Sequence, residues 1–191
     1  MYDLAIPEDR VQSLDQLMAQ LPGVIEAAPK DDGTLDMIIS RPDHGMRTQP
    51  QSVEVTSKSG VAGDHWSKGC WSSLSDGSPN PDVQICIMMS GVIGAIAGDR
   101  ANWPAAGDNF FLDMDLTPAN MPPGTRFSIG TAEFVVTDEP HNGCQSFIDR
   151  YGRDACLFVN TGQGKSLRLR GIYARVTKDG TVSVRDTVRK L

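Results

Sequence analysis

Residues 126–137 have the sequence RFSIGTAEFVVT, and they show how most of the chain is organised. We interpret the two halves, 126–129 and 132–137, as short strands. From residue 52 onward the chain continues in this way, with short β segments separated by turns rich in Gly, Pro, Asp and Asn. The expected strands are 53–56, 83–89, 109–112, 126–129, 132–137, 166–176 and 181–184. Such a series of short strands predicts a mainly β fold, either a barrel or a sandwich.

The first 50 residues follow a different pattern. Residues 8–21 are predicted to form a helix, because apolar side chains recur there at spacings of three and four. These apolar residues are Val11, Leu14, Leu17, Met18 and Leu21. The dipeptide at 22–23, Pro-Gly, is expected to end the helix, and a short strand is predicted at 35–40. The expected division is an N-terminal extension over 1–50 and a β domain over 53–189.

The composition indicates a globular domain that needs neither disulfides nor metal ions to fold. The chain has 191 residues, of which 39% are hydrophobic and 22% are charged, so it can bury a substantial core. No stretch approaches the ~18 consecutive apolar residues of a membrane span, and residues 1–4 do not begin the basic and then apolar run of a signal peptide. Cys70, Cys86, Cys144 and Cys156 lack the spacing of a disulfide framework. We therefore expect a cytoplasmic protein with four free thiols.

Charge is distributed unevenly along the chain. The formal net charge is −6, yet residues 163–191 carry eight basic and two acidic residues, which leaves −12 on the rest. An acidic protein with one basic segment is poorly suited to a long DNA duplex, because affinity for a polyanion follows the number of phosphates neutralised. A small anionic ligand suits this distribution better. The alternative is that the arginines simply form the solvated face of a terminal strand.

Two segments, 90–98 and 145–151, interrupt the β pattern, and each is predicted to form a short helix or a loop. The second follows a tight loop marked by Pro140 and Gly143, so that Cys144 is a candidate for a helix start. A thiolate at a helix start is stabilised by the free N–H groups, and nearby His141 or Arg153 would add to this effect. Such a thiolate could carry a persulfide or bind a soft metal.

Other interpretations of Cys144 remain open at this point. It could be a small buried hydrophobic residue, as many cysteines are. It could also be the nucleophile of a hydrolase with His141 as its base, although two residues so close in one loop seldom reach a productive geometry. A zinc site would have to collect His65, Cys70, His141 and Cys144, whose spacing resembles no zinc-finger pattern.

Two glycine-containing segments are candidates for pocket walls. Residues 159–166 end in Gly-Lys-Ser like a phosphate-binding loop, but position 159 is Val and no helix is expected to follow. We therefore expect a hairpin turn there, with Lys165 able to meet an anion. The segment 60–66 is expected to turn sharply, and its Asp64 could line a pocket.

Five segments taken in order carry a family resemblance. They are 60–66 (GVAGDHW), 107–116 (GDNFFLDMDL), 116–130 (LTPANMPPGTRFSIG), 141–147 (HNGCQSF) and 170–176 (RGIYARV). Together they resemble the MOSC domain, the family of the C-terminal domain of molybdenum cofactor sulfurases and of small stand-alone bacterial proteins. The resemblance extends over residues 53–189.

The resemblance implies a β-barrel with a few short helices and a role in handling sulfur or the molybdenum-pterin cofactor. The cysteine of the family falls on Cys144, whose soft thiolate suits molybdenum or a terminal sulfur. The phosphate of the pterin would need cations, and the chain offers Lys165, Arg168, Arg170 and Arg175 near its C-terminal strands. Residues 168 and 170 would share one face if that segment is a strand.

The leading hypothesis is a MOSC-like protein that binds a molybdenum-pterin cofactor or carries sulfur as a persulfide on Cys144, with His141 beside it. It would be a sulfur transferase or a component of a molybdenum-dependent oxidoreductase. The candidate binding residues are Lys165, Arg168, Arg170, Arg175, Arg153 and Asp64. Sulfur would come from a partner such as a pyridoxal-phosphate-dependent cysteine desulfurase. The alternatives are a non-catalytic module that binds a small anion, and a structural domain whose thiol is buried.

Overall fold

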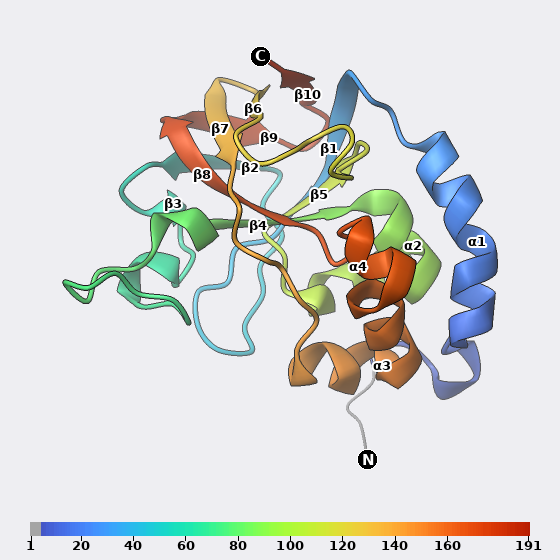
Figure 1. The fold of residues 1–191 in the computed structure, drawn as a ribbon. Helices are drawn as coiled ribbons and strands as arrows, with labels where there is room; N and C mark the ends of the chain where they lie inside the picture. Colours follow the sequence, from blue (N-terminus) through green and yellow to red (C-terminus); the bar gives the residue numbers. More distant parts are fainter. Residues whose placement is uncertain (1–4) are drawn as a thin grey trace.

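The fold is a closed β-barrel with helices packed against one side (Figure 1). A computed structural model describes residues 5–191, and residues 1–4, on which the argument about a signal peptide partly rests, lie outside the described part. Within that part, seven strands close the barrel in the order β1-β10-β6-β7-β8-β4-β5. The bounds are β1 Asp32–Ile38, β4 Ile85–Met89, β5 Phe110–Asp113, β6 Arg126–Ile129, β7 Ala132–Val136, β8 Ile172–Lys178 and β10 Thr187–Lys190. The expected β-barrel is thus confirmed.

The barrel is mixed, because β4 and β5 run parallel while their outer neighbours pair antiparallel. A parallel pair needs a crossover. The crossover here consists of α2, Ser90–Ala97, and the 3-10 helix η4, Arg100–Ala106. β5 and β8 both begin beside Ile87, in the middle of β4, and run from there in opposite directions.

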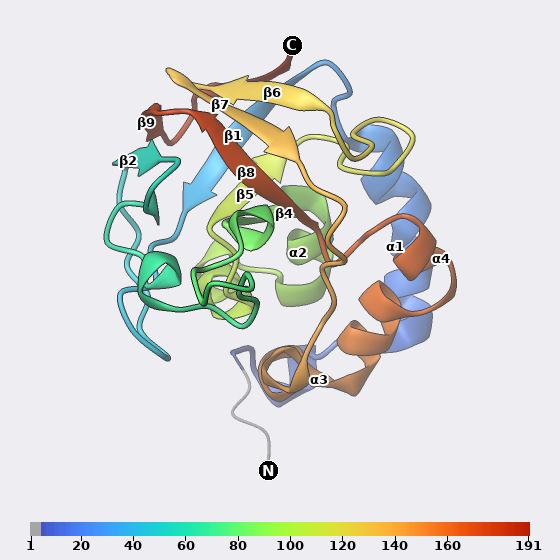
Figure 2. The ribbon, with the colours of Figure 1, turned by 60° about the vertical axis from the view of Figure 1, so that its left-hand side comes forward.

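A smaller sheet stands beside the barrel (Figure 2). In residues 5–191 it has three strands in the order β3-β2-β9, with β2 Ser52–Thr56, β3 Gly60–Val61 and β9 Gly180–Ser183. β9 lies between β8 and β10 in the chain, so this sheet continues directly from the barrel. Two short 3-10 helices, η2 Trp66–Lys68 and η3 Pro81–Val83, connect it to β4.

The barrel interior is filled by aromatic and aliphatic side chains. Phe134 stacks on Phe127 with a centroid separation of 5.2 Å and meets the edge of Phe110 at 6.1 Å. Every residue of β4 is buried, because one face of this strand lines the barrel and the other is covered by helices. In residues 5–191 such a filled interior leaves no channel through the barrel.

The helices gather on one side of the barrel (Figures 1 and 2). They are η1 Glu8–Arg10, α1 Leu14–Ala27, α2, α3 Gln145–Asn160 and α4 Gly162–Ser166, and α1 packs against α2 and α3. Ser13 begins α1 with a capping box that it shares with Gln16. None of the helices in residues 5–191 has the length and apolar character that crossing a membrane would require.

The prediction of a helix over 8–21 was partly wrong. Residues 8–10 form a separate 3-10 turn, and α1 continues through Pro22 as far as Ala27. Proline removes one hydrogen bond of the helix, at a cost of about 3 kcal/mol. The helix nevertheless continues, because Val24 and Ile25 beyond the proline pack against the hydrophobic core. β1, predicted at 35–40 within the N-terminal extension, is a strand of the barrel itself.

The prediction of a strand over 166–176 holds only from residue 172 onward, and the hairpin expected before it was wrong. Residues 162–166 form α4, residues 167–170 form turns, and β8 begins only at Ile172. Arg168 adopts a left-handed conformation with φ of 55°, so it cannot continue a strand. The sequence analysis also missed β3 and β10. The segment 145–151 is helical, but α3 continues to Asn160 through a kink.

Candidate functional site

The loop of residues 137–144 carries Cys144 from the end of β7 to the start of α3. At its first end the backbone N–H of Thr137 donates to the carbonyl of Tyr173 over 3.0 Å. At its other end Asn160 holds Gly143 from both sides. Its Oδ1 accepts from the N–H of Gly143 over 2.8 Å, and its Nδ2 donates to the carbonyl of Gly143 over 2.9 Å. The position of Cys144 is therefore fixed by β8 and by the C-terminal end of α3.

Cys144 is exposed and lies at the N-terminal boundary of α3. Among the cysteines, all of which lie in the described part, Cys86 and Cys156 are buried and Cys70 is partly buried. The alternative of a buried hydrophobic residue therefore does not apply to Cys144. Its thiol is open to reagents and partners from solvent.

A cavity of about 330 Å³ opens beside this loop. Residues 137–142 form one wall, Val159 and Lys165 another, and Arg168 with the start of β8 the third. The structure thus brings together three of the residues predicted for the site, His141, Lys165 and Arg168. Two carboxylates, Asp138 and Glu139, also line the cavity, so the lining carries charges of both signs.

Two residues of the cavity wall carry buried polar atoms that have no hydrogen-bond partner in residues 5–191. They are Nδ1 of His141 and Nε of Arg168. The Nη2 atom of Arg168, by contrast, is hydrogen-bonded, because it donates to the carbonyls of Leu116 and Met121. Buried polar groups in proteins are normally satisfied, and a ligand or water that reached these two atoms would complete their hydrogen bonding. Nδ1 of His141 faces the carboxylate of Asp108, 3.7 Å away.

Arg170, predicted to bind the cofactor, is buried in an ion pair. Its Nη1 lies 2.9 Å and 2.8 Å from the two carboxylate oxygens of Asp108, and its Nη2 donates to the carbonyl of Ala106 over 3.1 Å. The guanidinium also lies 4.9 Å from the ring centre of Phe147, in the first turn of α3. Arg170 therefore joins the loop before β5 to the helix that starts at Cys144.

His141 is held as a neutral imidazole beside this pair. Its side chain is 5% exposed, its Nδ1 lies 3.7 Å from Oδ1 of Asp108, and its ring centre lies 4.4 Å from that of Tyr173. Burial, assisted by the positive charge of Arg170, lowers the pKa of His141 well below its usual value. In the described structure His141 makes no hydrogen bond with Cys144, so the geometry does not form a Cys-His pair of a hydrolase.

A second network lies close to the buried ion pair, around Asn109, the residue that follows Asp108. Arg41 makes a bidentate pair with Asp64, with distances of 2.8 Å and 3.0 Å, and donates to Oδ1 of Asn109 over 3.1 Å. Its Nη1 lies 3.4 Å from Sγ of Cys86. Burial acts to raise the pKa of Asp64, but the hydrogen bond from Arg41 keeps it below its usual value. Asp64, predicted to line the binding pocket, thus supports the loop before β5.

The remaining predicted residues lie apart from the cavity. Arg175 is on β8, exposed, and paired with Asp82 at 3.0 Å. Arg153 is exposed on α3. No cluster of three or more potential metal-binding His, Cys, Asp or Glu side chains occurs in residues 5–191, so His65 and Cys70 are not gathered with Cys144.

The sequence analysis missed the acidic residue that organises the site, Asp108, together with Arg41 and Asn109. One signal was available, because Asp108 and Asn109 directly precede the apolar strand segment at 110–112. Polar residues at such a place are buried and need partners. Their partners are far away in the chain, and the sequence alone does not identify them.

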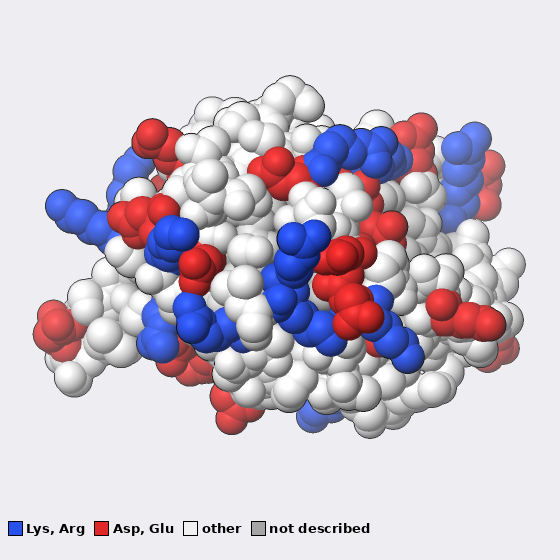
Figure 3. Space-filling model, turned by 90° about the horizontal axis from the view of Figure 1, so that it is seen from above, with Lys and Arg blue, Asp and Glu red and all other residues white. Residues whose placement is uncertain are grey.

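The C-terminal basic residues are largely paired. Arg189 lies 2.7 Å from Asp32, Lys178 lies 3.4 Å from Glu133, and Lys190 lies 3.6 Å from Asp31. On the face that contains these strands, Lys and Arg are interspersed with Asp and Glu (Figure 3). The charge of residues 163–191 is therefore locally compensated on this face.

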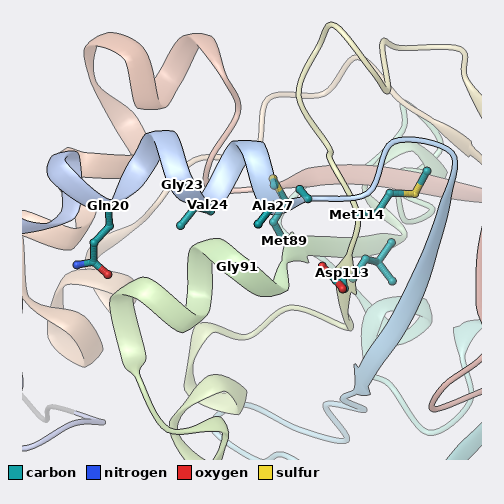
Figure 4. A pocket seen from close by; sticks show the side chains of 10 residues that line it. Gln20, Gly23, Val24, Ala27, Met89, Gly91, Asp113 and Met114 are labelled. Carbon is teal, nitrogen blue, oxygen red and sulfur yellow. The ribbon is translucent and has the colours of Figure 1, made fainter.

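A second hollow, of about 390 Å³, lies between α1 and α2 (Figure 4). Its described lining is mostly apolar, with Val24, Met89 and Met114, and it contains no cysteine, histidine, lysine or arginine. Because it lacks a nucleophile and a cation, this groove is less suited to chemistry on sulfur or anions than the cavity beside the Cys144 loop.

The family comparison identifies a domain in the C-terminal part of the chain. Residues 80–189 match the MOSC domain, and this match includes β4, the crossover, the Cys144 loop and all strands that follow. A search of curated proteins gave no match.

Three solved structures share the fold. The YuaD protein from Bacillus subtilis is 18% identical, with a TM-score of 0.58 over 82% of this chain and 94% of that one. YiiM from Escherichia coli is 20% identical, with a TM-score of 0.53 over 83% and 69% of the two chains. YiiM from Geobacillus stearothermophilus is 18% identical, with a TM-score of 0.54 over 83% and 75%. At these sequence identities the similarity shows a shared fold and nothing further.

The buried ion pair gives a prediction about stability. Asp108→Ala leaves the Arg170 charge buried without a partner, so we expect the free energy of unfolding to fall by about 3–5 kcal/mol. Asp82→Ala breaks the exposed pair with Arg175 and is the matched control, with an expected loss below about 1 kcal/mol. Urea denaturation followed by circular dichroism measures both. Equal losses in the two variants would contradict the role given to the Arg170–Asp108 pair.

The neutral state of His141 gives a prediction about pH. The unfolded chain protonates this histidine near pH 6.5, whereas the folded chain protonates it only at lower pH. The unfolded state therefore binds more protons below about pH 6.5, and stability falls as the pH is lowered from about 7 to about 5. His141→Gln should reduce this slope, by at most about 1.4 kcal/mol per pH unit. Urea denaturation across this pH range measures the slope.

The control for this prediction is His44→Gln, because His44 is an exposed histidine on a different loop. This variant should keep the slope of the wild type. An unchanged slope in His141→Gln would show that His141 is not the buried neutral group.

Proposed function

Since the chain belongs to the MOSC domain family, we propose that it carries a sulfur atom as a persulfide on Cys144. The observation that supports this most strongly is the position of the Cys144 thiol. It is exposed, and it ends a loop whose residues 137–142 line a cavity that also contains Lys165 and Arg168. A thiol in this position can receive sulfur from outside and hold it beside a pocket for an acceptor.

The chemistry required of Cys144 is thiol–persulfide exchange. The thiolate attacks the terminal sulfur of a donor persulfide, the new S–S bond forms on Cys144, and the donor leaves as a thiolate. No net oxidation takes place. The donor we propose is a cysteine desulfurase or another protein persulfide, and exposure of Cys144 is what lets such a large partner reach it.

The experiment that tests this function uses glutathione persulfide as the donor and compares wild type with Cys144→Ser. The wild-type chain should gain one sulfur atom on the peptide that contains Cys144, detected by mass spectrometry after alkylation and digestion. Cys144→Ser should lose this modification. Cys70→Ser is the matched control, because Cys70 is a partly buried thiol outside the cavity wall, and it should load like the wild type.

The loading experiment also has a clear negative result. Loading of Cys144→Ser to the wild-type level would place the reactive thiol elsewhere and contradict the proposed function. Absence of loading on the wild type by this donor would contradict it as well.

A second candidate is binding of the molybdenum-pterin cofactor, which the orphaned polar atoms favour. Nδ1 of His141 and Nε of Arg168 lack partners and belong to residues of the cavity wall, where a ligand with hydrogen-bonding groups would satisfy them. Cys144 offers the soft thiolate that molybdenum prefers, and Lys165 and Arg168 would hold the anionic phosphate. The residues therefore fit the cofactor in kind. When bound, the cofactor would supply oxygen-atom or electron transfer at the metal.

For this candidate, wild type and Cys144→Ala are expressed anaerobically in a host that makes the cofactor. Metal analysis and pterin fluorescence should show molybdenum and pterin on the wild type, and loss of both from Cys144→Ala. Pterin retained without Cys144 would favour the alternative of a binding module for a small anion. Absence of both from the wild type would contradict stable cofactor binding and leave the persulfide function standing.

A further inference from the structure

A kink in α3 brings a second cysteine to the Cys144 loop. Gly152 has φ of 84° and ψ of 168°, which are not helical values, so the helix turns at this residue. In a straight helix, residues 144 and 156 would be about 18 Å apart along the axis. Because of the kink, the second half of α3 folds back beside the loop that precedes the first half (Figures 1 and 2).

Cys156 lies directly against the residue that precedes Cys144. A β-carbon on Gly143 would lie 3.1 Å from Sγ of Cys156 and 3.2 Å from Nδ2 of Asn160, closer than most β-carbon contacts, so a larger residue would push these side chains away by a few tenths of an ångström. Nδ2 of Asn160 in turn lies 3.2 Å from the same Sγ, while it also holds the backbone of Gly143. The Cys156 sulfur thus lies beside Gly143. The Cα atom of Cys144 is only about 3.8 Å further along the chain, because consecutive Cα atoms have this spacing.

The two thiols have different surroundings. Cys144 is exposed, whereas Cys156 is only 8% exposed. Burial, and to a lesser degree the nearby Cys144, raises the pKa of the Cys156 thiol. Arg170 and the amide of Asn160 act in the opposite direction and would stabilise a thiolate there. Cys156 is therefore a protected thiol that solvent reagents reach less easily than Cys144.

We propose that Cys156 is the resolving cysteine of this site, which cleaves the persulfide on Cys144 and releases its terminal sulfur as hydrosulfide. This inference rests on the proposed persulfide function, which it extends. With a resolving cysteine, the chain would release sulfur as sulfide. Direct transfer of the terminal sulfur from Cys144 to an acceptor would need no second thiol.

The proposed step balances without an external oxidant. The Cys156 thiolate attacks Sγ of Cys144, an S–S bond forms between the two cysteines, and the bond from Sγ to the terminal sulfur breaks. The terminal sulfur leaves with the electron pair as hydrosulfide. The persulfide sulfur is reduced by two electrons, and the two cysteine thiols supply these electrons by becoming a disulfide. The proton lost by Cys156 goes to solvent, and a dithiol reductant restores both thiols.

The step requires one local movement. Cys144 is exposed in the reduced structure, and its side chain has to come within disulfide distance of Cys156. Because Asn160 holds Gly143 in place, this movement is confined to Cys144 itself and the start of the helix.

The test uses glutathione persulfide to load the full chain anaerobically, followed by removal of the donor and no added reductant. Wild type should release sulfide and become lighter by two hydrogens than the reduced, unloaded chain. A disulfide should map between the peptides of Cys144 and Cys156. Cys156→Ser should retain the extra sulfur on Cys144 and release sulfide only when dithiothreitol is added. Cys156→Ala should behave in the same way, which separates loss of the thiol from an effect of serine on packing.

Cys70→Ser is the control and should release sulfide like the wild type. Thermal melting confirms that each variant is folded at the assay temperature. Loading of the wild type without sulfide release or disulfide would overturn the resolving role and leave the persulfide function intact. Release at the wild-type rate from Cys156→Ser would overturn it too. Failure to load Cys144 at all would overturn both.

Discussion

The buried pair between Arg170 and Asp108 is the interaction on which the rest of the site depends. Asp108 lies two residues before β5 and Arg170 two residues before β8, and these strands flank β4 in the barrel. Both strands begin beside Ile87, so the pair spans the middle of β4, where Nη1 of Arg170 also lies 3.9 Å from the sulfur of Met88. Burying two charges this deeply costs desolvation energy, which their mutual attraction offsets. Removal of either partner would therefore leave the other as an unpaired buried charge.

The consequences of this pair reach Cys144 through two contacts. The Arg170 guanidinium lies over the ring of Phe147, which fixes the first turn of the helix that Cys144 begins. Burial, assisted by the charge of Arg170, also lowers the pKa of the neighbouring His141. The loop that carries Cys144 is consequently held next to buried charges that neutralise each other, while Cys144 itself is exposed to solvent. This arrangement separates the supporting residues, which are buried, from the reactive atom, which is exposed.

The sequence was informative where local pattern decides structure. The strands at 126–129 and 132–136 and the helix start at Cys144 follow from turn residues and apolar patterning within a few positions. The segment at 167–170 was mispredicted because alternating Leu and Arg resemble a strand. Its actual course follows from Arg170 having to reach Asp108, 62 residues earlier in the chain. The close approach of Cys156 to the Cys144 loop likewise depends on the kink at Gly152, which sequence spacing does not reveal.

The central claim is that Cys144 bears sulfur in the cell, and the most direct measurement is its chemical state in freshly isolated protein. The Cys156→Ser chain, which lacks the resolving thiol, would be isolated anaerobically after alkylation in intact cells and digested for mass spectrometry. An additional sulfur atom on the Cys144 peptide is the expected result. A Cys144 peptide that carries only the alkylated thiol, in cells whose other persulfides are preserved by the same treatment, would contradict the claim.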